Sequence, residues 1–270
     1  MQVRFWGTRG SLPVAMTSSE VRRKIIVALE TANGRQFSSP QEIEGFVDSM
    51  PQETSGTWGG NSPCVEVLGG ETHVICDMGS GARPLGNAKI VAYGPRSPQT
   101  YHVFLSHLHW DHLMGLPFFT PIYIPGNRMI IHGCHPELAQ AVKLQMAAPC
   151  FPVDFSQVGA TVEFDQMTPG ATAELAGFRV TPMLQLHGGD SYGYRFEKDG
   201  KAVVYSTDSE HKLESTEQLD SVVNFFRGAD LVIFDAMYSL AEAVSVKADW
   251  GHSSNIVGVE LCQKAGVKTL

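Results

Sequence analysis

The sequence has few cysteines, and none of them belongs to a CxxC pair. Five cysteines occur in 270 residues, at positions 64, 76, 134, 150 and 262. Their odd number and wide spacing argue against a disulfide framework and against a structural zinc module built on thiolates. We therefore expect buried free thiols.

The sequence also lacks a long hydrophobic run. No stretch approaches the roughly 20 consecutive apolar residues that a membrane-spanning helix needs. The first residues, MQVRFWGTRGS, include arginine and polar side chains where a secretory signal would be continuously apolar. With 43% hydrophobic and 18% charged residues, the composition is typical of soluble globular proteins. These features predict a soluble, cytoplasmic protein with no membrane partner.

Positive charge is scarce as well, because the formal net charge is -8. A protein that binds a long polyanion normally presents a basic face. A large nucleic acid is therefore a disfavoured partner.

The pattern of apolar residues predicts one α/β domain spanning residues 1–270. Short apolar runs bounded by Gly, Pro or Asp predict strands at 3–6, 64–69, 72–78, 101–107, 178–185, 192–196, 202–207 and 231–236. Amphipathic segments predict helices at about 81–88, 136–147, 214–227 and 253–265, and Ser253 and Ser254 are good N-cap residues for the last. Helices outside and sheets inside form a four-layer αββα sandwich.

Residues 15–57 differ from their surroundings and predict a helical insertion after the first strand. Ser39, Pro40 and Glu42 fit an N-cap, a first-turn proline and a capping-box partner, so a helix should begin there. A second helix is expected over 19–31. A lid, a dimerisation element and a packed surface decoration are all compatible with this segment.

The segment VFLSHLHWDHLMG carries the clearest chemical signal. It places His107, His109, Asp111 and His112 directly after a β-rich run, so the four side chains lie where a strand ends. In an extended loop residues i and i+2 point the same way, so His107 and His109 can share one ion. Asp111 and His112 follow a turn and face a second position.

This motif and its flanks resemble the signature of the metallo-β-lactamase superfamily. GGNSPCVEV (59–67) and CDMGSG (76–81) resemble the family's strand pair and Asp-x-Gly-x-Gly loop. LQLHGG has a histidine where the family places its next ligand, and YSTD has the aspartate that bridges two ions. The resemblance implies the αββα fold, a first ion on His107, His109 and His187, and a second on Asp111, His112 and Asp208.

Imidazole and carboxylate ligands without thiolate suit zinc, or alternatively manganese. Two divalent ions would supply a metal-bound hydroxide near neutral pH and steady both oxygens of a displacement at phosphorus. The family's usual last ligand is a histidine shortly after a strand expected near Val267, and the 270 residues contain none there. His211 is a candidate substitute.

Further segments resemble one branch of the superfamily, which contains ribonuclease Z, the cyclic-nucleotide phosphodiesterases and the phosphonate-pathway cyclic phosphodiesterase. They are FWGTRGSLP, VIFDAMYS with Asp235, and GHSSN with His252. A carboxylate that orients and charges a histidine lets the imidazolium protonate a leaving alkoxide. We therefore expect Asp111, Asp235 and His252 to be catalytic. Candidates for contacts with phosphate oxygens are Arg9, Asn61 and Ser80, which lie in glycine-containing loops.

The function that follows is a metal-dependent phosphodiesterase acting on a small phosphodiester, such as a cyclic nucleotide or cyclic phosphate. A ribonuclease Z-like RNA endonuclease is an alternative, but residues 119–177 contain no protruding basic arm, and His132 and His135 there are expected on the surface. A thioester or lactam hydrolase is also compatible with the motif, and so is a non-catalytic nucleotide-binding protein with a degenerate site. The resemblance also implies a homodimer.

Overall fold

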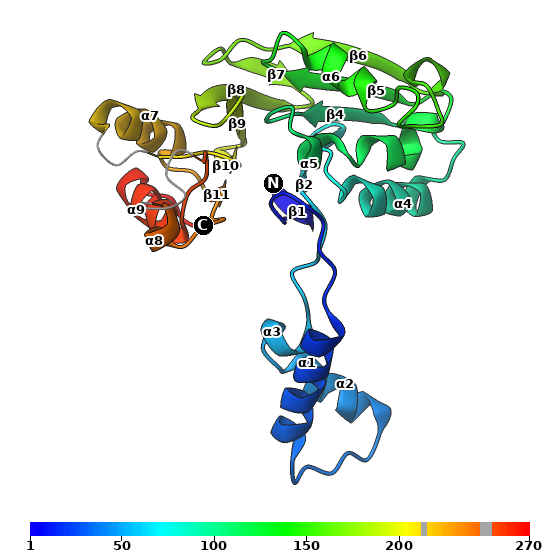
Figure 1. The fold of residues 1–270 in the computed structure, drawn as a ribbon, viewed down its shortest axis with the longest axis vertical. Coiled ribbons are helices and arrows are strands. Elements are labelled where there is room, and N and C mark those ends of the chain that lie inside the picture. Colours follow the sequence, from blue (N-terminus) through cyan, green and yellow to red (C-terminus); the bar gives the residue numbers. More distant parts are fainter. Residues whose placement is uncertain (212–214, 244–249) are drawn as a thin grey trace.

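The computed structural model describes residues 1–211, 215–243 and 250–270. These residues form two β-sheets that share a core, with helices on the outer face of each sheet, and a helical arm that projects from the body (Figure 1). Two sheets between outer helices are the α/β sandwich architecture expected from the sequence. Within the described residues, no helix is long and apolar enough to cross a membrane.

The first sheet has six strands in the order β1-β2-β3-β4-β5-β6. They are β1 (Gln2–Gly7), β2 (Cys64–Leu68), β3 (His73–Cys76), β4 (Thr100–Phe104), β5 (Arg128–Gly133) and β6 (Thr161–Gln166). β1, β2 and β3 pair antiparallel, whereas β3 to β6 pair parallel. The segments that follow β3, β4 and β5 therefore leave the sheet at one edge.

The second sheet has five strands in the order β11-β10-β9-β8-β7. They are β7 (Ala173–Leu175), β8 (Phe178–Gln185), β9 (Ser191–Lys198), β10 (Lys201–Ser206) and β11 (Leu231–Phe234). β10 pairs parallel with β11, and the remaining pairs are antiparallel. Consequently β8, β10 and β11 run in one direction and their carboxyl ends share an edge.

Three hydrophobic clusters hold the layers together. One joins the first sheet to α4 (Ala82–Tyr93) and α6 (Leu138–Leu144), and α5 (Trp110–Leu113) contributes Leu113 to it. A second lies between the sheets, where the ring of Phe104 meets that of Phe196 edge-on at 5.1 Å. The third joins the second sheet to α7 (Thr216–Phe226) and α9 (Asn255–Ala265), next to α8 (Leu240–Ala243). Short 3-10 helices lie at Leu116–Phe118, Thr120–Tyr123 and Phe155–Gln157.

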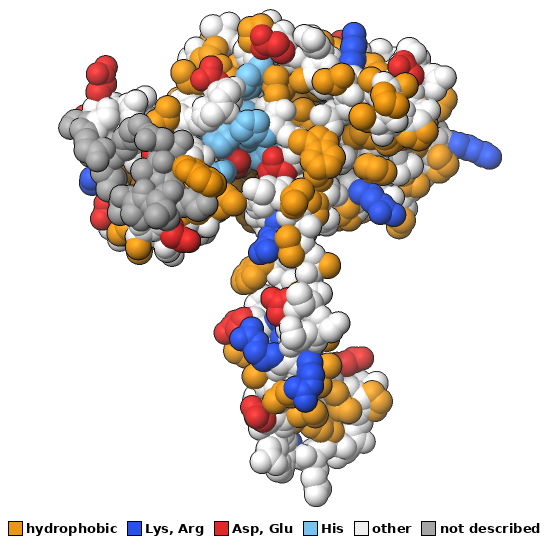
Figure 2. Space-filling model, in the orientation of Figure 1, with side chains coloured by type: hydrophobic (Ala, Val, Ile, Leu, Met, Phe, Trp, Pro, Cys, Tyr) orange, Lys and Arg blue, Asp and Glu red, His pale blue; other side chains and the backbone are white. Residues whose placement is uncertain are grey.

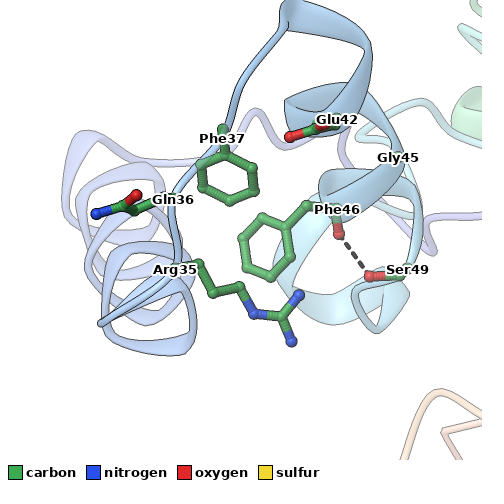
Figure 3. Close-up of a pocket in the computed structure, with 7 residues that line it drawn as sticks. All are labelled: Arg35, Gln36, Phe37, Glu42, Gly45, Phe46 and Ser49. Carbon is green, nitrogen blue, oxygen red and sulfur yellow. Dashed lines mark hydrogen bonds between the residues drawn. The ribbon is translucent and has the colours of Figure 1, made fainter.

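The expected insertion forms the arm, which contains α1 (Ser18–Ala32), α2 (Pro40–Asp48) and α3 (Gln52–Ser55). Ser39 caps α2 as expected, since its side chain accepts a hydrogen bond from the Glu42 backbone N–H. The arm packs on itself: Phe46 meets the ring of Phe37 at 5.3 Å and the guanidinium of Arg35 at 4.7 Å (Figure 3). It extends away from the two sheets instead of lying on them (Figure 1).

Several expectations about elements need correction. The ranges expected as strands do not include β5, β6 or β7. Residues 212–214, the last of which begins the expected helix 214–227, lie outside the described residues. The expectation that His132 and His135 lie on the surface is wrong, because both are buried. Alternation along β5 turns His132 inward, where Nδ1 lies 2.7 Å from Asp165 and Nε2 lies 2.9 Å from His102.

Candidate metal centre

The sequence-predicted metal ligands come together at the edge where the two sheets meet. His107, His109, Asp111 and His112 follow β4, His187 follows β8, and Asp208 follows β10. A backbone hydrogen bond of 2.8 Å from Tyr192 N–H to the Ser106 carbonyl ties the two sheets at this edge. Figure 2 shows a patch of histidine side chains at the surface, with acidic side chains beside it, above the base of the arm.

The imidazole nitrogens and carboxylate oxygens point toward one another. Nε2 of His187 lies 3.1 Å from Nδ1 of His109. Oδ2 of Asp208 is the common neighbour, at 3.4 Å from Nε2 of His112, 3.8 Å from that of His107 and 3.9 Å from that of His187. Asp208 thus lies near His107 and His187, which were expected to hold one ion, and near His112, which was expected to hold another.

The outer nitrogens of these imidazoles are fixed by hydrogen bonds. Nδ1 of His112 lies 2.7 Å from Oδ2 of Asp77, and Nδ1 of His187 lies 2.7 Å from the Gly251 carbonyl oxygen. Ser106 Oγ donates to Asp77 and therefore accepts from Nδ1 of His107, at 3.0 Å. In each case the proton is on Nδ1, so the lone pair of Nε2 is directed into the centre.

The residues present fit a metal ion. Within the described part of the chain, Nε2 of His107 and Nε2 of His112 are buried and make no hydrogen bond. A buried imidazole nitrogen without a partner costs free energy, so native structures rarely leave one. Coordination of divalent ions would satisfy both atoms, and neutral imidazoles with carboxylates are suitable zinc ligands.

The electrostatics of the cluster are those of a cation site. Burial, followed by the neighbouring His112 charge, holds the pKa of His107 well below its usual value. Burial also disfavours the charged form of His112, but the charges of Asp77 and Asp208 prevail and raise its pKa. Burial opposes ionisation of Asp208, yet the adjacent His112 lowers its pKa overall. Buried carboxylates beside buried imidazoles form an environment that favours a bound cation.

Asp235 and His252 form the expected pair beside the cluster. Nδ1 of His252 donates to Oδ2 of Asp235 at 2.8 Å. Burial lowers the pKa of His252, but the hydrogen bond to Asp235 and the charges of Asp235 and Asp208 outweigh it, so the pKa is raised. Ligand-type atoms of His187, Asp208 and His252 lie within 4.8 Å of one another. His252 is therefore close enough to act at the centre, either as a proton donor or as a ligand.

The expected phosphate-contacting residues lie in neighbouring loops. The hydroxyl of Ser80 donates to Oδ1 of Asn61 at 2.9 Å, so these side chains bind each other. Arg9 is exposed, and its backbone N–H donates to the Asn61 carbonyl at 2.9 Å. In the same region the Ser11 N–H donates to Oδ2 of Asp111 at 3.0 Å. Phosphate contacts by Arg9, Asn61 and Ser80 stay a prediction.

Sequence reasoning did not single out three residues that support the ligands. Asp77 fixes His112, and its signal was present in CDMGSG, where it follows β3. Gly251 accepts the hydrogen bond from His187, and no local pattern announces this contact. His135 lies with Nε2 at 3.2 Å from the carbonyl oxygens of both Gly189 and Asp190, in the loop that follows His187.

Comparisons with known proteins agree with this geometry. A family model described as "Beta-lactamase superfamily domain" matches residues 74–270. Over 148 residues the chain is 27% identical to "Uncharacterized protein ML1173" of Mycobacterium leprae, a match that covers 53% of this chain. The chain spans about half the length of that relative, 49%.

Solved structures show the same fold. Human tRNase Z, short form, aligns with a TM-score of 0.61 and 17% identity, covering 99% of this chain and 90% of that one. A diphosphatase from the PhnP family aligns with a TM-score of 0.59 and 19% identity, covering 99% and 83%. The metallo-β-lactamase fold protein YhfI of Bacillus subtilis gives 0.57 and 18%, covering 78% and 77%.

Proposed function

The chain belongs to the metallo-β-lactamase superfamily of hydrolases, and we propose that it is a metal-dependent phosphodiesterase acting on a small phosphodiester. A cyclic nucleotide and a cyclic phosphate are the first substrates to test. The observation that carries this proposal is the Asp235–His252 hydrogen bond of 2.8 Å beside the metal-type cluster. This pair supports a proton donor beside the centre, which a poor leaving group needs.

Two divalent ions are proposed as cofactors, with zinc first and manganese second. His107, His109 and His187 would hold one ion, and Asp111, His112 and Asp208 the other, with Asp208 shared. Ions of this kind act as Lewis acids toward phosphoryl oxygens and lower the pKa of water.

His252 is proposed to protonate the oxygen that leaves phosphorus. Its Nδ1–H is bound to Asp235, so the proton available for transfer is the one on Nε2. Bound cations would offset the charges of Asp208 and Asp111, so Asp235 is the group that would still raise the pKa of His252 in the metal-bound protein. An alkoxide leaves phosphorus poorly unless it is protonated, whereas a thiolate leaves readily.

The names of two structural neighbours, a tRNase Z and a diphosphatase, support chemistry at phosphorus. A small substrate is preferred to transfer RNA, because the net charge of -8 opposes binding of a long polyanion.

The test combines elemental analysis of bound metal with hydrolysis of two phosphodiesters, one with a p-nitrophenolate and one with an alkoxide leaving group. His252→Ala should retain its metal and lose about 100-fold or more in turnover of the alkoxide substrate. The loss with p-nitrophenolate should be much smaller, because this group leaves without protonation.

Other outcomes contradict the proposal. No metal and no hydrolysis by the wild-type protein would leave a binding protein on a hydrolase fold. Loss of metal from His252→Ala would make His252 a ligand. Unchanged phosphodiester turnover in that variant, together with efficient hydrolysis of a thioester or a lactam, would favour a thioester or lactam hydrolase.

A further inference from the structure

One peptide group, that of Gly251, contacts both His187 and Glu210. The Nδ1–H of His187 donates to the Gly251 carbonyl at 2.7 Å, and the Gly251 N–H donates to Oε2 of Glu210 at 3.1 Å. The backbone N–H of Glu210 in turn donates to the carbonyl of Leu186 at 2.8 Å, one residue before His187. These three bonds close a ring through three segments, at 186–187, 210 and 251, that are far apart in the sequence.

Position 251 accepts only glycine in this arrangement. Its φ is +78°, in the left-handed region that side chains disfavour. A Cβ atom there would lie 2.4 Å from Nδ1 and 3.3 Å from Cα of His187. The contact is with the ring and backbone of His187 at once, so a small rotation of the imidazole does not relieve it.

The residue after Gly251 is the proposed proton donor. The rings of His252 and His187 are 5.1 Å apart, and His252 is bound to Asp235. The hydroxyl of Ser253 donates to the carbonyl of Ser209 at 2.7 Å, so the 251–253 segment is also held by the chain that follows Asp208. A displacement of Gly251 therefore displaces His252 with it.

We propose that Gly251 and Glu210 are positioning residues that fix the tautomer of His187 and couple ion binding at His187 to the placement of His252. Glu210 polarises the Gly251 peptide, which strengthens its carbonyl as an acceptor for Nδ1–H. The proton is thereby kept on Nδ1 and Nε2 is left free for an ion. With an ion on Nε2 the Nδ1–H is a stronger donor, so it holds the loop of His252 more firmly. This inference rests on the proposed function only in giving His252 a task.

The experiment compares Gly251→Ala, Glu210→Ala and Glu210→Gln with a matched control, Gly34→Ala. Gly34 has the same φ of +78° but no atom within 4 Å of the added Cβ, so it reproduces the backbone strain without the contact. Zinc affinity is measured by competition with a chelator, and His187→Ala identifies the binding step that depends on His187.

Gly251→Ala and Glu210→Ala should weaken that step by about 10- to 100-fold, the usual effect of removing a group that orients a ligand. Glu210→Gln should stay closer to wild type, because its amide oxygen still accepts the Gly251 N–H. Gly34→Ala should match wild type. Circular dichroism checks whether each variant is folded. If Gly251→Ala does not fold, Glu210→Ala tests the same hydrogen-bonded ring.

A second readout uses imidazole 15N NMR and does not depend on activity. In metal-free wild type His187 should carry its proton on Nδ1, whereas Gly251→Ala and Glu210→Ala should show a mixture of tautomers. Added zinc should slow exchange of the His252 Nδ1–H in wild type and not in these variants.

The two proposals fail in different ways. Wild-type protein that binds no zinc contradicts the proposed function, while the metal-free tautomer still tests the role of Gly251 and Glu210. Wild-type protein that binds zinc, with Gly251→Ala and Glu210→Ala binding it as tightly as Gly34→Ala, contradicts the positioning role alone.

Discussion

Asp77 holds the histidines of the candidate metal centre in place by accepting four hydrogen bonds. The donors are the N–H and the hydroxyl of Ser106, at 2.8 and 2.7 Å, Nδ1 of His112 at 2.7 Å and the hydroxyl of Tyr205 at 2.7 Å. Asp77 is fully buried and adopts a φ of +58°. One carboxylate thereby sets the tautomer of His112 directly and that of His107 through Ser106.

Asp77→Asn should therefore reduce metal affinity although it replaces none of the proposed metal ligands. The amide NH2 cannot accept a hydrogen bond, so at least one of the four donors loses its partner. We expect zinc affinity to fall by about 10- to 100-fold, measured by chelator competition. Asp165→Asn is the control. Asp165 also accepts a hydrogen bond from a histidine, with its Oδ2 at 2.7 Å from Nδ1 of His132, but this pair is not part of the metal-type cluster. Equal affinities of the two variants would contradict this role.

Asp235→Asn should change the pH dependence of turnover. The raised pKa of His252 keeps the imidazolium present to higher pH, and turnover that needs this acid falls as pH rises through that pKa. Removing the Asp235 charge lowers the pKa of His252, so the fall should move to lower pH. Profiles of kcat against pH from about 5 to 10 for both proteins measure the shift. An unchanged basic limb would mean that His252 is not the group that titrates.

The local sequence predicts the residues that meet at the centre but not those that orient them. Spacing within HLHWDH, together with strand ends, indicated that His107, His109, Asp111 and His112 lie close to one another, as they do. Glu210 and Gly251 act across more than 40 residues of sequence, through hydrogen bonds that only the folded chain forms. His132 shows the opposite error, because a partly exposed carboxylate on a neighbouring strand, that of Asp165, accepts a hydrogen bond from the imidazole and makes its burial tolerable.

At the scale of elements, the arm depends on a very small core of its own. Phe46 is the one buried residue between 18 and 55, a stretch that the structure describes in full. It packs against Phe37 and under Arg35 (Figure 3). A three-helix unit with one buried aromatic residue has little stability to lose.

Phe46→Ala should unfold the arm and leave the body folded. Removing a buried phenyl ring costs about 3 kcal/mol or more, which is large for so small a unit. Hydrogen exchange should show loss of protection in α1, α2 and α3 only, with zinc binding unchanged. Ile43→Ala, on an exposed face of α2, is the matched control and should leave protection intact. Loss of zinc from Phe46→Ala would show that the arm supports the centre.

Elements with strong local signals were predicted from sequence, and weakly signalled ones were not. Ser254 caps α9 with its side chain, as its position before an amphipathic run indicates. β6, TVEFDQ, is a half-exposed edge strand whose alternation rests on two apolar residues, Val162 and Phe164, and β7 has three residues, so neither gives a strong local signal. Their pairing with β5 and β8 is what makes them strands, and that pairing is not local.

At the scale of the whole molecule, helix α1 of the arm exposes apolar side chains, whose contact with water is unfavourable. Val21, Ile25 and Leu29 recur at every fourth position of α1 and are 44%, 54% and 67% exposed. A stripe of this kind is typical of a surface that contacts another protein. It gives a structural basis for testing the homodimer expected from the resemblance.

Deletion of the arm separates its contribution from that of the body. The two chain segments that connect the arm to the body lie side by side, because the Val14 N–H donates to the Gly60 carbonyl at 2.8 Å. A short glycine-serine linker can therefore replace residues 16–58 at low entropic cost. Since the arm packs on itself and its helices lie away from the histidine patch (Figures 1 and 2), the shortened chain should match the full chain in zinc binding and in the proposed phosphodiesterase activity. Sedimentation should give a dimer for the full chain and a monomer after deletion. A shortened chain that remains dimeric would place the interface on the body, and one that binds zinc but no longer hydrolyses substrate would make the arm part of the substrate site.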